Sequence, residues 1–267
     1  MNKIKIQDID FSSLERMHHQ GSKSIMYEDI DICYKILDGL TTYEKEVLYR
    51  KLMDMDGMKI DGVCLPTDLI VQNDELVGFT MSKFKNSMTI YDKFLGQHVA
   101  FKELFDYIAK ACKILIEIHK NGIICQDLSF DNILVDNNGN VAFCDLDGCY
   151  YNGYESPFIS MPMKKLICEY RKEAFVVCKN FDRISILVSL YYLIYNRYLH
   201  IIPRRNLNFL AKNVETIYNT MIFIDTLLDK SKIIPEVPYL DELIIPSDDY
   251  VMDREKEFNL LRRILKK

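Results

Sequence analysis

One stretch of the chain, Ile123–Gly148, constrains the fold more than any other part of the sequence. Two apolar runs in it, Ile133–Val135 and Val141–Cys144, flank a polar segment that contains Asn138-Gly139. An Asn-Gly pair between such runs is the strongest short-range signal for a β-hairpin, because both residues readily adopt the backbone of a two-residue turn. We therefore expect an antiparallel hairpin with Asn138 and Gly139 at its tip.

The expected hairpin brings polar side chains together at its open end. With this turn, Asn132 lies directly opposite Asp145, and facing Cα atoms in an antiparallel pair are about 4.5–5.5 Å apart. An amide oxygen and a carboxylate at that separation can bind one hard cation, such as Mg²⁺. Asp127, five residues before Asn132, adds a carboxylate that fits the proton acceptor of phosphoryl transfer. Asp and Asn are also common in surface turns, so the spacing alone leaves both interpretations open.

Charge and hydropathy exclude several classes of protein. The 267 residues are 49% apolar and 27% charged, as in a globular protein, and their formal net charge is −5. Nucleic-acid binding needs a clustered basic face, which a net charge of −5 does not favour, so we expect no nucleic-acid partner. The N-terminus lacks the apolar segment of a signal peptide, and the most apolar segment, Ile184–Tyr195, is shorter than the ~20 residues of a membrane span. We expect no membrane partner.

The eight cysteines include no C-x-x-C pair and no Cys/His cluster with zinc spacing. Several of them lie within apolar runs, where cysteine behaves as a small buried hydrophobic residue. A reducing, cytoplasmic location is the simplest expectation.

The first 85 residues predict an antiparallel sheet with one helix packed on it. Alternating apolar residues indicate about five strands, of which the clearest are Ile32–Asp38, Val63–Val71 and Leu76–Phe84. The helix is expected to begin at Thr41 and to end near Met55.

Lys35 stands in the middle of the strand Ile32–Asp38. A lysine in an apolar strand either extends its ammonium group to the surface or meets a buried anion. Glu44 matches the end of a capping box that begins at Thr41, and it also lies one turn before Leu48 on the apolar side of the helix. Glu44 is therefore the better candidate to reach inward towards Lys35.

From Lys85-Asn86-Ser87 onward the sequence becomes mostly helical. Helices are expected over residues 100–120, 181–198, 206–229 and 252–266. His119 lies on the apolar stripe of the first of these, and we expect it to be a core histidine. The segments together predict an α+β fold with a boundary near residue 85.

Six segments match one known pattern in the right order. They are Ile32–Lys35 for the strand motif V-A-I-K, Glu44–Leu48 for a helix glutamate and leucine, Phe79–Phe84 with Met81 as gatekeeper for a hinge strand, Cys125–Asn132 for H-R-D-L-x-x-x-N, Asp145–Asp147 for D-F-G, and Asp182–Ile186 for D-x-W-S-L. Over about residues 17–200 the chain thus resembles the protein-kinase-like superfamily, in the manner of a divergent bacterial- or viral-type Ser/Thr protein kinase. The resemblance implies a bilobal fold, with a small sheet lobe of residues 1–85 and a mostly helical lobe of residues 86–267 that carries the catalytic hairpin.

The resemblance also implies ATP and Mg²⁺ as cofactors and a role for each matching residue. Lys35 would hold the α- and β-phosphates and pair with Glu44. Asn132 and Asp145 would bind Mg²⁺, and Asp127 would orient the attacking hydroxyl group and accept its proton. The residues implied to bind the nucleotide are Gly21 over the phosphates, Met26 and Leu134 on either side of the adenine, Ser82 and Phe84 at its edge, Cys144 beside it, and Lys35 and Glu44.

Several features depart from the family's pattern. Gly21 is the only one of the three loop glycines, and Cys125-Gln126 replaces His-Arg. Asp147 replaces the glycine of D-F-G, either as an extra metal ligand or as a plain polar residue. No A-P-E motif follows, which weakens the case for a platform that binds a peptide substrate.

Three functions are compatible with the sequence. The joint presence of Lys35, Asp127, Asn132 and Asp145 favours an active phosphotransferase, with Ser or Thr of a protein favoured over a small molecule as acceptor. A small-molecule kinase of the aminoglycoside or choline type is the second, because these also tolerate a degenerate loop and lack A-P-E. The third is a pseudokinase that binds nucleotide or a partner without transfer. The sequence leaves the oligomeric state open.

Overall fold

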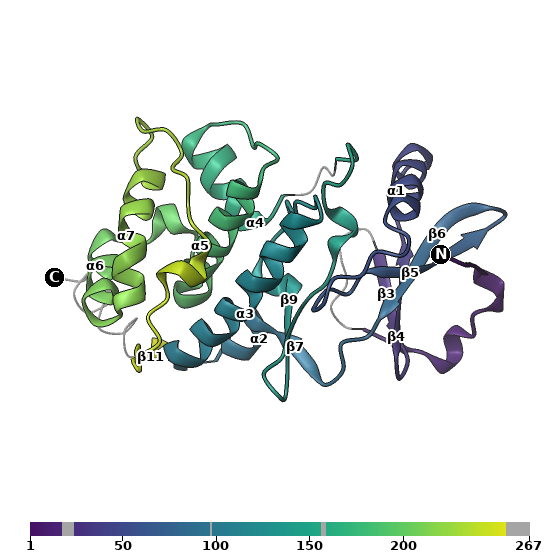
Figure 1. Cartoon of the computed structure of the whole chain (residues 1–267), viewed down its shortest axis with the longest axis horizontal. Helices are drawn as coiled ribbons and strands as arrows, with labels where there is room; N and C mark the ends of the chain where they lie inside the picture. The colour runs from purple at the N-terminus through teal and green to yellow at the C-terminus, as the bar shows by residue number, and fades with distance from the viewer. Residues whose placement is uncertain (18–23, 97, 156–158, 255–267) are drawn as a thin grey trace.

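The computed structural model describes residues 1–17, 24–96, 98–155 and 159–254, and Figure 1 shows how they are arranged. Gly21, implied to lie over the phosphates, falls outside the described residues, and so does nearly all of the helix expected over 252–266. Val251–Asp253, where that helix was expected to begin, form strand β11, which pairs with β8 (His98–Ala100).

A six-stranded sheet forms the N-terminal part of the chain. In order across the sheet, its strands are β1 (Lys3–Lys5), β5 (Pro66–Gln72), β6 (Glu75–Ser82), β4 (Ile32–Leu37), β3 (Ser24–Glu28) and β2 (Glu15–Arg16). β1 runs parallel to β5, whereas the other pairings are antiparallel, so the sheet is mixed. The expectation of about five antiparallel strands missed β1 and β2, because strands of 3 and 2 residues are too short to show a period.

Helix α1 (Thr42–Asp54) packs against this sheet. It begins with the predicted capping box, in which the Thr41 hydroxyl oxygen accepts from Glu44 N at 3.2 Å. Its apolar side joins the sheet in a hydrophobic cluster of Cys33, Leu37, Leu48, Leu52, Leu69, Val71, Leu76, Phe79 and Met81. Strand β4 presents alternate residues to this side, which places Lys35 on the buried face between Cys33 and Leu37.

The remainder of the chain is mostly helical. Its helices are α2 (Ile90–Phe94), α3 (Phe101–Lys120), α4 (Met161–Met163) continued by the π-helix Lys164–Arg171, α5 (Lys179–Tyr195), α6 (Arg204–Asn213) and α7 (Glu215–Leu228). The single helix expected over 206–229 is two helices, because Val214 has an extended backbone with φ −132°. Asp248 then caps the start of α7 by accepting from the backbone N of Glu215 and Thr216, each at 3.0 Å.

The central hairpin is present, but its register differs from the prediction by one residue. It is formed by β9 (Ile133–Asp136) and β10 (Val141–Phe143), and β7 (Ser87–Thr89) extends it to three strands. The turn has three residues instead of two, because Asp136 Oδ1 accepts from the backbone N of Asn138 and Asn140 at 2.8 Å each and Gly139 takes φ +75°. Asn132 consequently faces Cys144, whose N donates to Asn132 O at 3.0 Å, and not Asp145.

The structure is an α+β fold with two hydrophobic clusters. The smaller is the cluster between α1 and the six-stranded sheet, and the larger is built around α3, α5 and the hairpin. Figure 1 shows the sheet and α1 at one end of the long axis, α6 and α7 at the other, and α3 and β9 between them. None of the helices in the described ranges is both long and apolar enough to cross a membrane.

Candidate active site

Lys35 meets two carboxylates from the segment that follows β10. Its Nζ donates to Asp145 and to Asp147 Oδ1, the latter at 2.8 Å. The ring of Phe79 lies beside the ammonium group, with its centroid 5.7 Å from Nζ. Lys35 as a whole residue is only 8% exposed. The interpretation of Lys35 as a lysine that meets buried anions is therefore confirmed.

The partner predicted for Lys35 is wrong. The Glu44 carboxylate accepts from Thr41 N at 2.7 Å and from Thr41 Oγ1 at 2.8 Å, which completes the capping box and commits the side chain to the helix start. The Lys35 ion pairs are made with Asp145 and Asp147 instead. Asp147, which the sequence suggested to be a metal ligand or a plain polar residue, thus occupies the role expected of Glu44.

Helix α1 contacts this site through a lysine that sequence reasoning missed. Lys51 Nζ donates to the backbone oxygens of Asp147 and of Cys149, the latter at 2.8 Å. Lys51 is 3% exposed and lies three residues after Leu48 on the buried side of α1. A lysine at the spacing of the apolar stripe was the available signal, because such a residue must satisfy its charge internally.

The ion pairs set the charge state of the site. Burial alone would lower the pKa of Lys35, but Asp147 and then Asp145 raise that pKa above its ordinary value, so Lys35 is a cation. Burial would raise the pKa of Asp147, but Lys35 outweighs it and the pKa is lowered. The pKa of Asp145 is raised, by burial and by the neighbouring Asp147 charge. Asp147 is thus the fixed partner of Lys35, and Asp145, 43% exposed against 14% for Asp147, is the carboxylate that faces outward.

The loop that carries Asp127 is held through its backbone by Asp182 of α5. The two Asp182 carboxylate oxygens accept from Cys125 N at 2.7 Å and from Gln126 N at 3.0 Å. His119 Nε2 lies 3.0 Å from the same carboxylate, and its ring is buried, which confirms His119 as a core histidine. Gln126 adopts a left-handed backbone with φ +59°, a conformation that non-glycine residues keep only where surrounding contacts impose it.

Asp127 and Asn132 are joined directly. Asn132 Nδ2 donates to the backbone oxygen of Asp127 at 2.8 Å, which fixes the side-chain amide and leaves its Oδ1 as the atom available to a cation. Burial, followed by the charge of Asp145, raises the pKa of Asp127 to about 6. Asp127 is therefore ionised at neutral pH, yet its pKa is close enough to that pH for efficient proton transfer.

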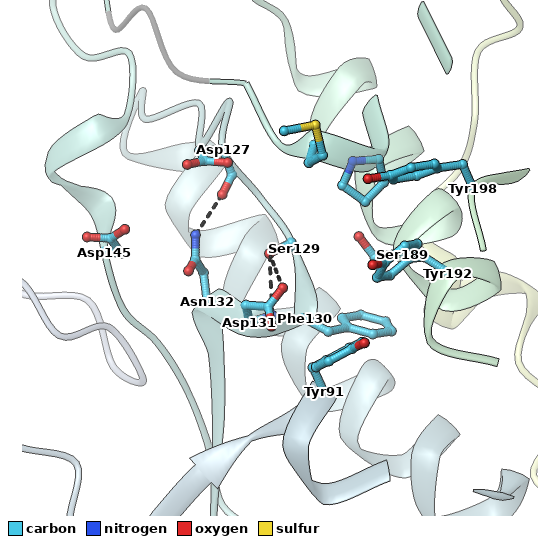
Figure 2. A pocket seen from close by; sticks show the side chains of 12 residues that line it. Tyr91, Asp127, Ser129, Phe130, Asp131, Asn132, Asp145, Ser189, Tyr192 and Tyr198 are labelled. Carbon is cyan, nitrogen blue, oxygen red and sulfur yellow. Dashed lines mark hydrogen bonds between the residues drawn. The ribbon is translucent and has the colours of Figure 1, made fainter. Parts of the chain in front are cut away.

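These groups border one cavity. Asp127, Asn132 and Asp145 are among the residues that line a cavity of about 290 Å³. Figure 2 shows Asp127 and Asn132 on one side of it, Ser189, Tyr192 and Tyr198 on the other, and Tyr91 and Phe130 below. The structure thus brings the predicted base, Asp127, and both predicted metal ligands to the lining of one cavity, and Lys35 contacts one of these ligands, Asp145.

The residues implied for the adenine lie on other elements and outside the lining of this cavity. Met26 faces Lys35 across the β3–β4 pair. Leu134, in β9, and Cys144, directly after β10, are both half-buried, and burial raises the pKa of the Cys144 thiol. Nothing in these positions conflicts with the predicted nucleotide contacts, which stay predictions.

The end of β6 carries the two residues implied to meet the adenine edge. Ser82 pairs with Ile32 of β4 and is exposed. The backbone oxygen of Phe84 already accepts from Ser87 Oγ at 2.5 Å. A ligand at this edge would therefore meet an acceptor that is partly satisfied.

The donor set fits a hard divalent cation. In the described part of the chain no three His, Cys, Asp or Glu residues form a metal-binding cluster. One carboxylate from Asp145 and one amide oxygen from Asn132 are instead the ligands expected where phosphates and water complete the shell of Mg²⁺. The balance of charge also favours binding of a cation. The site has two lysines, Lys35 and Lys51, and three carboxylates, those of Asp127, Asp145 and Asp147.

Comparison with known proteins adds no family to this picture. No model of a known protein family matches the chain, and no curated protein matches its sequence.

Proposed function

We propose that the protein is a phosphotransferase of the protein-kinase-like type that uses ATP and Mg²⁺. The observation that carries the proposal is that Asp127, Asn132 and Asp145 line one cavity, and that the buried Lys35 donates to Asp145 beside it. A buried lysine, an amide and two carboxylates in this arrangement match what phosphoryl transfer requires of a protein.

Each residue has a distinct task in this proposal. Bound MgATP would supply the phosphoryl group, with the negative charge of the phosphates partly neutralised by the metal ion. Asp145 and Asn132 would hold the metal, and Lys35, kept in place by Asp147, would contact phosphate oxygens. Asp127 would accept a hydrogen bond from the acceptor's hydroxyl group and take its proton as the new O–P bond forms and the bond from the γ-phosphorus to the departing ADP breaks. A pKa of about 6 keeps Asp127 in the ionised form that this role needs.

Transfer from labelled ATP tests the proposal. The purified protein is incubated with Mg²⁺, labelled ATP and a panel of hydroxyl acceptors that includes Ser/Thr peptides, small alcohols and the protein itself. We expect transfer that falls by about 10²–10⁴-fold in Asp127→Asn and in Lys35→Met. Asp106→Asn, an exposed aspartate of α3, is the matched control and should keep full transfer. Transfer that survives Asp127→Asn would show that Asp127 is not the base.

A pseudokinase is the second candidate, and one contact favours it. Lys35 donates directly to Asp145, the carboxylate that would have to hold the metal. If this contact persists with nucleotide bound, the protein binds nucleotide without transferring phosphate. Stabilisation of the fold by ADP or ATP, insensitive to Mg²⁺ and without transfer to any acceptor, would identify that function.

A further inference from the structure

The wall of the cavity opposite Asp127 is aromatic. The rings of Tyr91 from α2 and Tyr192 from α5 are stacked with centroids 5.9 Å apart, and Tyr192 and Tyr198 are stacked at 5.3 Å. Figure 2 places Tyr192 and Tyr198 across the hollow from Asp127, with Tyr91 below them. Helix α2 and, about a hundred residues further along the chain, α5 and the turn that follows it thus contribute to one row of tyrosine rings.

The lining carries negative charge. In the described part of the chain, the residues that line the cavity include three aspartates, Asp127, Asp131 and Asp145, and no lysine, arginine or histidine. Aromatic faces attract cations, and more strongly where water is excluded. One cation already uses this wall, since Lys165 Nζ lies 6.0 Å from the centroid of the Tyr198 ring. A positively charged guest would therefore be favoured over a neutral or anionic one.

The lining also holds a buried hydroxyl group without a partner. Ser189 is 3% exposed, and its Oγ makes no hydrogen bond. Ser189 lies three residues before Tyr192 on α5, so both side chains are on the face that lines the cavity. Buried hydroxyl groups are normally hydrogen-bonded, and a polar group of a bound molecule would satisfy this one.

We propose that this cavity binds the phosphate acceptor, and that the acceptor is a small cationic amino alcohol. Its ammonium group would lie against the tyrosine stack, Ser189 Oγ would bond a polar atom, and its hydroxyl group would point to Asp127. The inference rests on the proposed function for the direction of transfer. A volume of about 290 Å³, with Phe130, Met161 and Pro162 in its lining, suits a small molecule better than an extended peptide.

Binding of a matched pair of probes tests the proposal without relying on transfer. The probes are choline and 3,3-dimethylbutan-1-ol, which share shape and hydroxyl group but differ in charge. Calorimetric titration of the full chain should give an affinity for choline about 10-fold or more above that of the neutral analogue, the range of a cation–aromatic contact. Equal affinities, or no binding of choline or ethanolamine at millimolar concentration, would overturn the proposal.

Variants locate the site. Tyr192→Leu should weaken choline binding about 10-fold, and Tyr192→Phe should restore it to within about threefold. Ser189→Ala should weaken the binding of ethanolamine, whose ammonium group can donate to Ser189 Oγ, and should leave that of choline, which has no N–H, unchanged. Tyr218→Leu, at a tyrosine that is 68% exposed on α7, should change nothing. Loss of the fold is monitored by thermal unfolding of each variant. Choline binding that is unaffected by Tyr192→Leu would place it elsewhere and refute the assignment.

The two proposals fail in different ways. Choline binding with no phosphate transfer in the presence of MgATP would count against the phosphotransferase and leave the cationic site standing. Transfer to a Ser/Thr peptide, lost in Asp127→Asn but unaffected by choline and by Tyr192→Leu, would support the phosphotransferase and overturn the small-molecule acceptor.

Discussion

Lys35 and Asp147 form an ion pair at 2.8 Å between residues that are 112 positions apart in the sequence. The pair joins the six-stranded sheet to the segment after β10, while Lys51 joins α1 to the backbone of the same segment. One short segment therefore receives a cation from the sheet and another from the helix. Its position depends on both.

We expect Asp147→Asn to destabilise the protein more than Glu44→Gln. The first change leaves Lys35 with Asp145 alone in a buried site and should lower the free energy of unfolding by about 2 kcal/mol. The second weakens an exposed capping box and should cost about 0.5–1 kcal/mol. Urea unfolding at pH 7 measures both. A larger loss in Glu44→Gln would contradict the role given to Asp147.

The Asp147 contribution has a defined pH dependence. The pKa of Asp147 is lowered in the folded state, so its stabilising effect is fully present above the unfolded value of 3.8 and is lost as the pH falls below it. The difference between wild type and Asp147→Asn should therefore be constant from pH 5 to 7 and shrink towards pH 3.

Asp127→Asn should stabilise the fold at neutral pH, whereas Asp147→Asn should destabilise it. The pKa of Asp127 is raised from 3.8 to about 6, so the folded state binds more protons between these values and stability falls as the pH rises through them. Each pKa unit corresponds to about 1.4 kcal/mol. Allowing for partial exposure, we expect a gain of about 1–2 kcal/mol at pH 7.5 that disappears below pH 4. Equal unfolding free energies at pH 7.5 would contradict the raised pKa.

In the proposed transfer, the pKa of Asp127 also determines where the rate falls at low pH, the acidic limb of the pH–rate profile. Asp127 must be ionised to accept a proton, so kcat/KM should be flat above about pH 6 and fall about tenfold per pH unit below it. Saturating Mg²⁺ should move the limb to lower pH, because a cation on Asp145 would remove the like-charge repulsion that helps to raise the pKa of Asp127. A rate profile without an acidic limb between pH 5 and 6.5 would argue against Asp127 as the base.

Lys51→Met should loosen the segment after β10. The change removes a buried cation whose pKa burial lowers, but it leaves the backbone oxygens of Asp147 and Cys149 without their donor. We expect a loss of about 1–2 kcal/mol in unfolding free energy. Amide hydrogen exchange over residues 145–150 should accelerate by more than the global loss explains, whereas exchange in α5 should follow the global loss. Uniform acceleration across the chain would refute a local role.

Gly78→Ala should disturb the position of Lys35 from the neighbouring strand. A Cβ atom at Gly78 would lie 2.4 Å from the backbone oxygen of Lys35, so β4 or β6 must shift to admit it. We expect a loss of about 2 kcal/mol or more in unfolding free energy. Gly96→Ala, where a Cβ meets nothing within 4 Å, is the matched control and should be within about 0.5 kcal/mol of wild type. Similar values for the two variants would contradict the close approach.

Features with local causes could be predicted from the sequence. Helices α1, α3 and α5 follow from helical spacing, and the capping box at Thr41 marks the start of α1. Alternation predicted a strand at β4 with Lys35 in its middle, but it left open whether the Lys35 side chain is buried. Asp127 and Asn132 line one cavity, as expected from a hairpin at the predicted place.

Features that depend on residues distant in the sequence could not be predicted. The break between α6 and α7 depends on Asp248, which lies more than thirty residues along the chain from the break. The charge partner of Lys35 was assigned to Glu44 by helix position, whereas the fold supplies Asp147 from the far side of the hairpin. The one-residue register error arose because the Asp136 side chain favours a three-residue turn over the Asn-Gly pair alone.

The bonds from Cys125 N and Gln126 N to Asp182 have a consequence for how this loop can vary. The main chain makes the connection, and every amino acid except proline provides an amide hydrogen. The identity of the two side chains is therefore not fixed by the link to α5. Chains built in this way would be recognised more reliably by an acid at position 182 facing two backbone amides than by the letters of the loop itself.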